Sequence, residues 1–241
     1  MFTGAFLNAL GIVLGGVAGL TVRGQMAAAT QLAIRGLLGA VTIYIGLRLE
    51  WVSFNGTFIQ VLKSFVILLA ALILGGFAGR LLRLQQTMNR AGQYASRRYA
   101  ETKPGDPNRL NDGFTVCALI FCAAPLGMVG AVEDGLAGHW EPLAVKMVMD
   151  GLAAMGFVRI FGWSVMACAF PVFVFEGTLT MGARQIEPLL RAHALADPVN
   201  AVSGFMIICV SLILLEVRKV RLADYFPALA LAPLLAWVWR G

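Results

Sequence analysis

Apolar runs recur along the whole chain, each close to or longer than the roughly 18 residues typical of a membrane-spanning helix. Eight segments are expected to span a membrane: 4–22, 29–48, 58–82, 113–131, 142–158, 162–181, 199–217 and 223–239. The 241-residue chain is 59% hydrophobic and only 13% charged, whereas a soluble domain carries about 25% charged residues. Because a helix satisfies its own backbone hydrogen bonds in lipid, the sequence predicts an all-α, multi-pass membrane protein.

The division between the fifth and sixth segments is the weakest in this series. The stretch FVRIFGW at 157–163 has to turn between them, with Gly156 and Gly162 as the expected flexible points. Seven spans, one of them a broken helix, are the alternative to eight. Pro125 and Pro171 also lie within expected spans, where a proline removes a backbone donor and favours a kinked or broken helix.

A basic polar segment divides the chain into two expected membrane units. Residues 1–82 hold three expected spans, residues 113–241 hold about five, and residues 83–112 form the linker. Seven of the nineteen basic residues lie in or beside this linker, which are Arg80, Arg83, Arg90, Arg97, Arg98, Lys103 and Arg109. Short loops rich in lysine and arginine favour the cytoplasmic side, so the linker is expected to be cytoplasmic, its first half a helix on anionic lipid. Eight spans then place both termini outside, in the periplasm of a bacterial inner membrane. No nucleic-acid partner is expected, because no recognisable nucleic-acid fold accompanies the basic residues.

Glycines at regular spacing predict close helix packing. Gly11, Gly15 and Gly19 recur every four residues in the first span, and Gly75 and Gly79 end the third span. Small residues at this spacing allow two helix backbones to approach closely in lipid. We therefore expect the first and third spans to pack together through these glycines, within one subunit or across a homodimer.

A weak internal similarity suggests that the chain contains a repeat. Residues 36–50, GLLGAVTIYIGLRLE, resemble residues 204–218, GFMIICVSLILLEVR, and these two spans are expected to run in opposite directions. If the first three spans correspond to the last three, the two halves are inverted repeats. This construction is common in secondary transporters.

Polar residues within or beside the apolar runs are the candidates for a substrate- or ion-binding site. They are Asn8, Glu133, Asp134, Lys146, Asp150 and Glu176. Lys146 and Asp150 are four residues apart, so on a helix they share one face and can pair. A charge at the bilayer centre costs at least about 2.5–3.5 kcal/mol on insertion scales, so Asp150 and Glu176 need a partner, a proton or water. Glu133 and Asp134 are expected to start an outer loop, at the mouth of an outward-facing vestibule that the other four residues line.

Structural interpretations compete with this site. Glu133 and Asp134 also fit a solvated loop, and Lys146 also fits a side chain that reaches outward to the membrane surface. Asn8 also fits a simple hydrogen bond between two helices. Asp150 leaves the least room for a purely structural interpretation, because it is the deepest charge in its span.

Five stretches along the chain occur together, in order, in one known family. They are GAFLNALGIVLGGVAGL (4–20), GAVEDGL (130–136), KMVMDGLAAM (146–155), PVFVFEGTLT (171–180) and ADYFPALALAPLL (223–235). The chain thereby resembles the bacterial inner-membrane proteins grouped as domain of unknown function 554. Glu176 departs from the family pattern, in which a glutamine is expected in many members. The resemblance implies a polytopic membrane fold and a transporter, without a substrate or a mechanism.

The sequence contains none of the motifs G-x-S-x-G, H-E-x-x-H or G-x-x-x-x-G-K-[ST], so it predicts no enzyme of those classes and no ATP-driven transport. No cofactor or metal is expected either, since His139 and His193 lie in loops without metal-ligand spacing. The favoured function is a cation- or proton-coupled secondary carrier of an ion or small solute. The alternatives are a cation-selective channel, an enzyme acting on a lipid or prenyl substrate through Asp150 and Lys146, and a structural membrane protein without transport activity.

Overall fold

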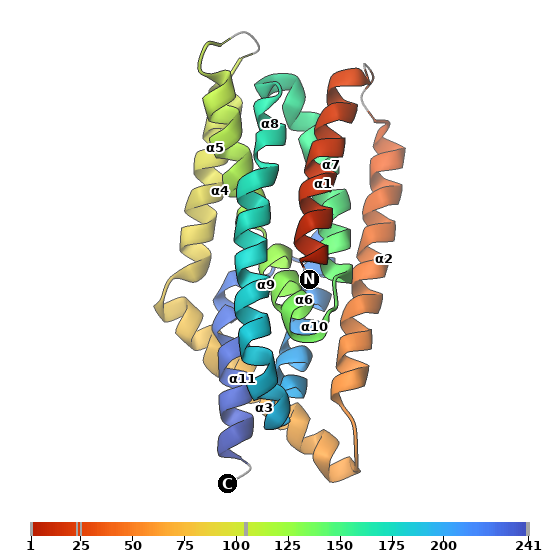
Figure 1. Ribbon diagram of the computed structural model, residues 1–241, viewed down its shortest axis with the longest axis vertical. Coiled ribbons are helices and arrows are strands. Elements are labelled where there is room, and N and C mark those ends of the chain that lie inside the picture. The colour runs from red at the N-terminus through yellow and green to blue at the C-terminus, as the bar shows by residue number, and fades with distance from the viewer. Residues whose placement is uncertain (1, 23, 25, 104–105, 240–241) are drawn as a thin grey trace. The chain divides into compact units, whose positions relative to one another are not determined.

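The computed structural model describes residues 2–22, 24, 26–103 and 106–239, and every regular element in these ranges is a helix (Figure 1). The elements are α1 (Thr3–Thr21), α2 (Ala28–Ser53), α3 (Phe58–Leu81), α4 (Leu84–Glu101), α5 (Arg109–Cys122), α6 (Pro125–Ala137), α7 (Glu141–Phe161), α8 (Ser164–Ala167), α9 (Ala169–Ala192), α10 (Ala196–Leu214), η1 (Leu222–Tyr225) and α11 (Phe226–Val238). The prediction of an all-α fold is confirmed. Both chain ends, which were predicted to face the periplasm, lie outside the described residues.

Five helical segments among the described residues are long and apolar enough to cross a membrane, namely α1, α2, α3, α10 and the continuous stretch Ser164–Ala192. A sixth is added if α5 and α6, which meet at 58°, form one broken span. The chain is therefore a multi-pass membrane protein in contact with the lipid bilayer. All eight predicted segments fall on helices, but the structure supports five or six of them as spans. The others are α7, which carries several charged residues, and the short apolar stretch Leu222–Val238.

The helices group into two compact units, each built from two separate stretches of the chain. Unit 1 consists of Met1–Gln31 and Met88–Gly182, and unit 2 consists of Leu32–Thr87 and Ala183–Gly241. Each unit thus combines helices that precede the polar segment 83–112 with helices that follow it. All six predicted site residues belong to unit 1.

Helices α1 and α7 lie side by side in unit 1 and run in the same direction (Figure 1). Their backbones approach so closely that a Cβ atom added to Gly15 would lie less than 3.0 Å from the backbone of Gly151. One turn earlier, a Cβ on Gly11 would meet the Met147 carbonyl oxygen at 2.6 Å. Only residues without a side chain permit this approach, which in lipid is stabilised by van der Waals packing.

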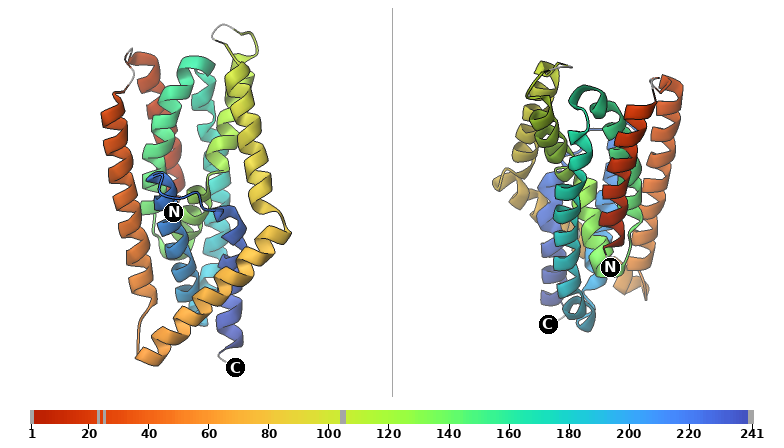
Figure 2. Two further views of the ribbon diagram at one scale, coloured as in Figure 1. Left: turned by 180° about the vertical axis from the view of Figure 1, so that it is seen from behind. Right: turned by 45° about the horizontal axis from the view of Figure 1, so that its top comes forward.

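Helix α3 lies beside α11 within unit 2 (Figure 2), and its glycines make an equivalent contact. A Cβ on Gly75 would meet Ala228 of α11 at 2.6 Å, and Gly79 faces the backbone of Asp224 in η1. The prediction that glycines mediate close packing is confirmed, but the predicted partners were wrong. The α1 glycines are covered by α7 and the α3 glycines by η1 and α11, because these partners present small residues and bare carbonyls at the matching positions.

A break separates α5 from α6, as the proline in AAPLG predicted. Pro125 has no N–H to donate to the Phe121 carbonyl, so it cannot continue α5, and it instead occupies the first turn of α6, where no donor is needed. Helix α6 ends at Gly138, whose φ of 72° lies in the left-handed region that glycine adopts without strain. Helix α7 begins three residues later with Glu141 and Pro142. This tight turn folds α7 back along α6.

The polar segment 83–112 begins as a helix, α4, which confirms the helix predicted for its first half, while its contact with anionic lipid stays a prediction. Ala95 is the one α4 residue that is fully buried. The Tyr99 ring packs edge-on against the rings of Phe157 and Phe161 at centroid distances of 5.5 and 5.8 Å. Two aromatic contacts of Tyr99 therefore anchor the end of α4 to α7, while most of α4 stays exposed.

Candidate functional site

Four of the six predicted site residues meet inside unit 1, and we call them the polar quartet: Asn8 of α1, Lys146 and Asp150 of α7, and Glu176 of α9. The Asn8 Nδ2 atom donates hydrogen bonds to Asp150 Oδ2 at 3.1 Å and to Glu176 Oε1 at 2.8 Å. Lys146 Nζ forms an ion pair with Asp150 and lies 3.4 Å from Glu176 Oε1. The predicted pairing of Lys146 with Asp150 is confirmed.

The glycine contact between α1 and α7 brings Asn8 into this group. Lys146 and Asp150 share one face of α7 because four residues make about one helical turn. Asn8 lies one turn before Gly11, which sits directly on Met147 of α7. The bare glycine surface lets α1 approach until its short asparagine side chain reaches the carboxylate of Asp150.

The first turn of α6 closes another side of the polar quartet. A Cβ atom on Gly127 would lie 2.8 Å from Lys146 Cε and 3.0 Å from Glu176 Oε1. Glycine at this position therefore leaves room for the lysine side chain to reach Glu176. The N-terminal end of a helix carries partial positive charge, so the start of α6 stabilises the Glu176 carboxylate. Gly127 was not a predicted site residue; its signal in the sequence is the glycine directly after the break at Pro125.

The polar quartet is buried, since none of its members is more than 6% exposed. Two carboxylates face one ammonium group, so the fully ionised group carries one net negative charge. Asn8 Oδ1 and Glu176 Oε2 are also buried without a hydrogen-bond partner among the described residues. Unsatisfied buried acceptors are costly, and two of them beside an excess negative charge suit a proton or a small cation.

Helix α9 carries a further buried hydroxyl group, one turn after Glu176. Thr180 lies one turn after Glu176 on α9, is 2% exposed, and has no hydrogen-bond partner for its Oγ1 atom among the described residues. Thr178, which also follows Glu176, instead donates to the Val174 carbonyl of its own helix. Of the two threonines, Thr180 is thus the one whose hydroxyl is left available inside unit 1.

The structure corrects the predicted position of Glu133 and Asp134. Both residues lie inside α6 rather than in a loop, and both are buried. Asp134 Oδ2 accepts a hydrogen bond from the Gly4 backbone N–H at 3.1 Å, which satisfies one of the free amides that begin α1. The prediction that Glu133 and Asp134 form a solvated acidic entrance was therefore wrong. In place of an open vestibule, the structure shows buried polar residues. The error arose because Gly135 after two acids resembles a turn, whereas here α6 continues to Ala137.

The structure also bears on metal binding. Among the described residues, no group of three or more histidine, cysteine, aspartate and glutamate side chains is arranged to hold a metal ion. The oxygen atoms of the polar quartet come from two carboxylates and one amide, with the Lys146 ammonium between them. This donor set favours a monovalent species over a tightly chelated divalent metal.

Comparison with known proteins identifies relatives of this chain. The chain is 26% identical over 243 residues to YqgA, an uncharacterised protein of Escherichia coli (strain K12), and the match covers 100% of this chain and 99% of that protein. It is 23% identical over 173 residues to YdfK, an uncharacterised membrane protein of Bacillus subtilis (strain 168), with 72% of this chain and 71% of that protein covered. No solved structure matches significantly. The family model described as "Protein of unknown function (DUF554)" matches residues 3–237, so the resemblance is confirmed and the chain belongs to this family.

Proposed function

We propose that the protein is a cation- or proton-coupled secondary carrier of an ion or small solute, with the polar quartet as its ion-binding site. The observation that carries this proposal is the buried group of two carboxylates around one lysine, inside a unit of apolar helices. Ionisable residues within membrane helices are costly, and they commonly mark ion pathways or proton relays.

The chemistry of the quartet supports binding of a single positive charge. A proton on Glu176, or a small cation held by Glu176 Oε2 and Asn8 Oδ1, neutralises the excess negative charge and satisfies both free acceptors. Either event changes the balance of charge around Lys146, which contacts both carboxylates. Binding is thereby coupled to the position of the lysine side chain.

The broken helix beside the quartet supports a conformational step. Helices α5 and α6 meet at 58°, and Gly127 in the first turn of α6 lies against Lys146 and Glu176. Many secondary carriers bind ions where a membrane helix is interrupted. In this proposal, the α5–α6 break is the element that moves when the charge of the quartet changes.

We also propose eight membrane crossings, with the linker 83–112 in the cytoplasm and both termini outside. Two helical segments would supply the crossings beyond the six candidates, α7 and Leu222–Val238. The charges of α7 do not oppose this, because Lys146 and Asp150 neutralise each other within the protein. The 17 residues of Leu222–Val238 reach the lower limit of a spanning segment, about 17 residues. The inverted repeat of the first and last three spans stays a prediction.

Flux in proteoliposomes tests the function. Purified protein would be reconstituted into liposomes, and gradients of sodium, potassium or protons would be imposed. Radiolabelled cations would report cation uptake, and trapped pyranine would report internal pH. A carrier should give flux that saturates with cation concentration and that disappears in Asp150→Asn. Glu216→Gln is the matched control, because Glu216 forms an exposed ion pair with Arg35 in unit 2.

The same measurement separates the competing functions. Stepwise single-channel currents would indicate that the protein is a channel and not a carrier. Flux that is equal in wild type and in Asp150→Asn would remove the polar quartet from the transport pathway. Absence of flux under every gradient would leave the structural alternative.

A further inference from the structure

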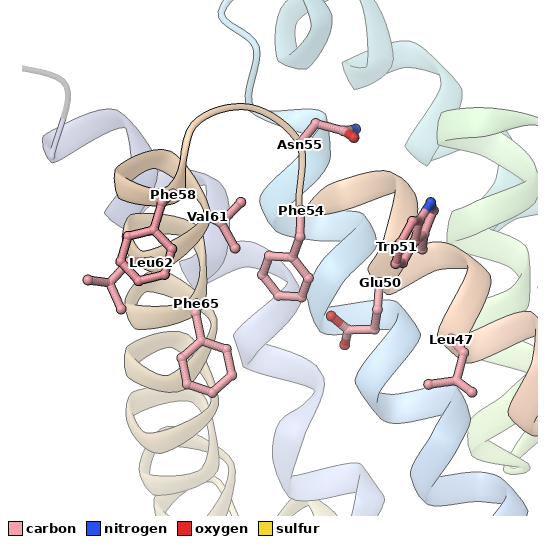
Figure 3. Close-up of a pocket in the computed structure, with 9 residues that line it drawn as sticks. All are labelled: Leu47, Glu50, Trp51, Phe54, Asn55, Phe58, Val61, Leu62 and Phe65. Carbon is pink, nitrogen blue, oxygen red and sulfur yellow. The ribbon is translucent and has the colours of Figure 1, made fainter.

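A pocket of about 740 Å³ opens between the last turns of α2 and the first half of α3, within unit 2 (Figure 3). Aromatic side chains dominate its lining, namely Trp51, Phe54, Phe58 and Phe65. The Phe54 and Phe65 rings lie 6.4 Å apart, one from each side. This volume falls within the range of about 300–1,000 Å³ typical of small-molecule sites.

Glu50 is the one ionisable side chain among the residues that line this pocket. Figure 3 shows its carboxylate turned from α2 toward the space between the two helices, on the side of the Phe54 ring. The Oε2 atom is buried and has no hydrogen-bond partner among the described residues. The stem of the side chain rests on α10, where Glu50 Cγ would lie 3.2 Å from a Cβ atom on Gly204. One oxygen of the carboxylate is therefore buried against apolar side chains, although Glu50 as a whole is half-buried.

The position of Glu50 in its helix adds further negative potential. Glu50 lies in the last turn of α2, where the helix dipole places partial negative charge and disfavours an anion. No basic residue occupies this last turn to compensate. Both the carboxylate and the helix end therefore favour a positive charge in the pocket.

The lining decides which kind of cation fits. An inorganic cation needs several oxygen ligands, whereas this pocket offers mainly rings and aliphatic side chains around a single carboxylate. Aromatic faces attract organic cations, and the apolar lining favours a hydrophobic body. We propose that this pocket binds a lipophilic monovalent organic cation, whose charge pairs with Glu50 and whose apolar part packs against Trp51, Phe54, Phe58 and Phe65.

The location near the end of α2 is consistent with this class of ligand. Glu50 lies three residues before the helix ends at Ser53, and Trp51 follows it directly. Tryptophan is enriched where membrane helices meet the interface, so the pocket is expected at that depth. The ligand can therefore reach the pocket from the bilayer surface. This inference does not depend on the carrier function of the polar quartet, because all residues involved belong to unit 2.

Two probes of nearly the same shape and opposite charge test the proposal. Equilibrium dialysis of the full-length protein in detergent, corrected with protein-free micelles, would measure saturable binding of tetraphenylphosphonium and of tetraphenylborate. We expect saturable binding of the cation alone. Glu50→Gln keeps the shape of the side chain and should weaken binding about tenfold or more, the value of one charge-assisted contact. Phe65→Leu keeps the pocket apolar and should weaken binding by a smaller factor, because one ring is lost.

Matched controls make the result decisive. Glu216→Gln removes an exposed carboxylate of the same unit and should bind the cation like wild type, while thermal unfolding of each variant verifies that it is folded. Equal binding of both probes, or equal binding by wild type and Glu50→Gln, would overturn the proposal. A copurified phospholipid that the cation does not displace would assign the pocket to lipid instead. A dimer whose dissociation first exposes the pocket would assign it to a second copy of the chain.

Discussion

The side-chain amide nitrogen of Asn8, Nδ2, lies 2.8 Å from Glu176 Oε1, although the two residues are 168 positions apart in the sequence. The same nitrogen also donates to Asp150, so one neutral side chain links the two carboxylates that surround Lys146. The four residues thus form a connected network rather than separate pairs, and removal of one member changes the partners of the others.

Asp150→Asn should abolish coupled flux while leaving the protein folded. The asparagine keeps the shape of the side chain, and Lys146 retains Glu176 as a counterion, so the group becomes a neutral ion pair. Flux in proteoliposomes and thermal unfolding in detergent check the two halves of this prediction. Normal transport by this variant would make the deepest charge of α7 structural.

Lys146→Met should instead destabilise the protein strongly. It leaves two buried carboxylates, Asp150 and Glu176, without their cation, and loss of one partner from a buried pair typically costs about 3–5 kcal/mol. Thermal and denaturant unfolding measure the loss. The double variant Lys146→Met/Asp150→Asn should recover part of it, because only one carboxylate remains. A stability close to wild type for the single variant would show that the quartet is uncharged.

Gly15→Ala should destabilise the α1–α7 contact. The added methyl group would lie less than 3.0 Å from the backbone of Gly151, and overpacking of this kind costs about 1–3 kcal/mol. Gly15→Leu should be worse. Gly156→Ala, on α7 itself, is the control: an added Cβ there meets no atom within 4 Å, so this variant should be as stable as wild type or slightly more stable, given alanine's higher helix propensity.

Asp134→Ala should weaken the start of α1. Its carboxylate accepts the Gly4 N–H bond at 3.1 Å, and loss of such a cap typically costs about 1 kcal/mol. Asp134→Asn retains an acceptor oxygen and should cost less. Hydrogen exchange at the first turn of α1 measures the effect locally. Equal protection in both variants and wild type would mean that another acceptor replaces Asp134.

A cysteine at Asn108 should react only with reagents that reach the cytoplasm. Asn108 is exposed at the start of α5, and Cys117, Cys168 and Cys209 are buried, so the background from these native thiols should be low. Labelling with membrane-impermeant maleimide before and after cell lysis gives the side of the membrane. Modification in intact cells from the periplasm would reverse the proposed topology.

The positions of the helices and most of the polar quartet were accessible to sequence reasoning. Apolar run length locates each helix because lipid forces the backbone to bond to itself, and the cost of buried charge singles out Lys146, Asp150 and Glu176. Helix partners were not accessible. The sequence around Gly15 looks the same whether α3 or α7 packs on it, because a small residue permits the close approach of a helix without determining which helix it is.

The misplaced acids and the overlooked carboxylate share a physical cause. Glu133 and Asp134 looked solvated because burial is a property of the assembled unit, and two acids before a glycine are also typical of a turn. Glu50 was overlooked because a single acid near the end of a span normally points to water. Only the structure shows that this acid lines an apolar pocket together with Trp51, Phe54 and Phe65.

The pairing of α1 with α7 has a consequence for how the protein is made. The ribosome adds Asp150 142 residues later than Asn8. At about 5–20 residues per second, this delay is roughly 7–28 s. During this interval α1 must enter the bilayer on its own hydrophobicity, with Asn8 and a ridge of glycines facing lipid or the insertion machinery. Assembly of the site is therefore a late event in biogenesis, and a chain truncated before α7 should leave α1 without its partner and exposed to membrane quality-control proteases.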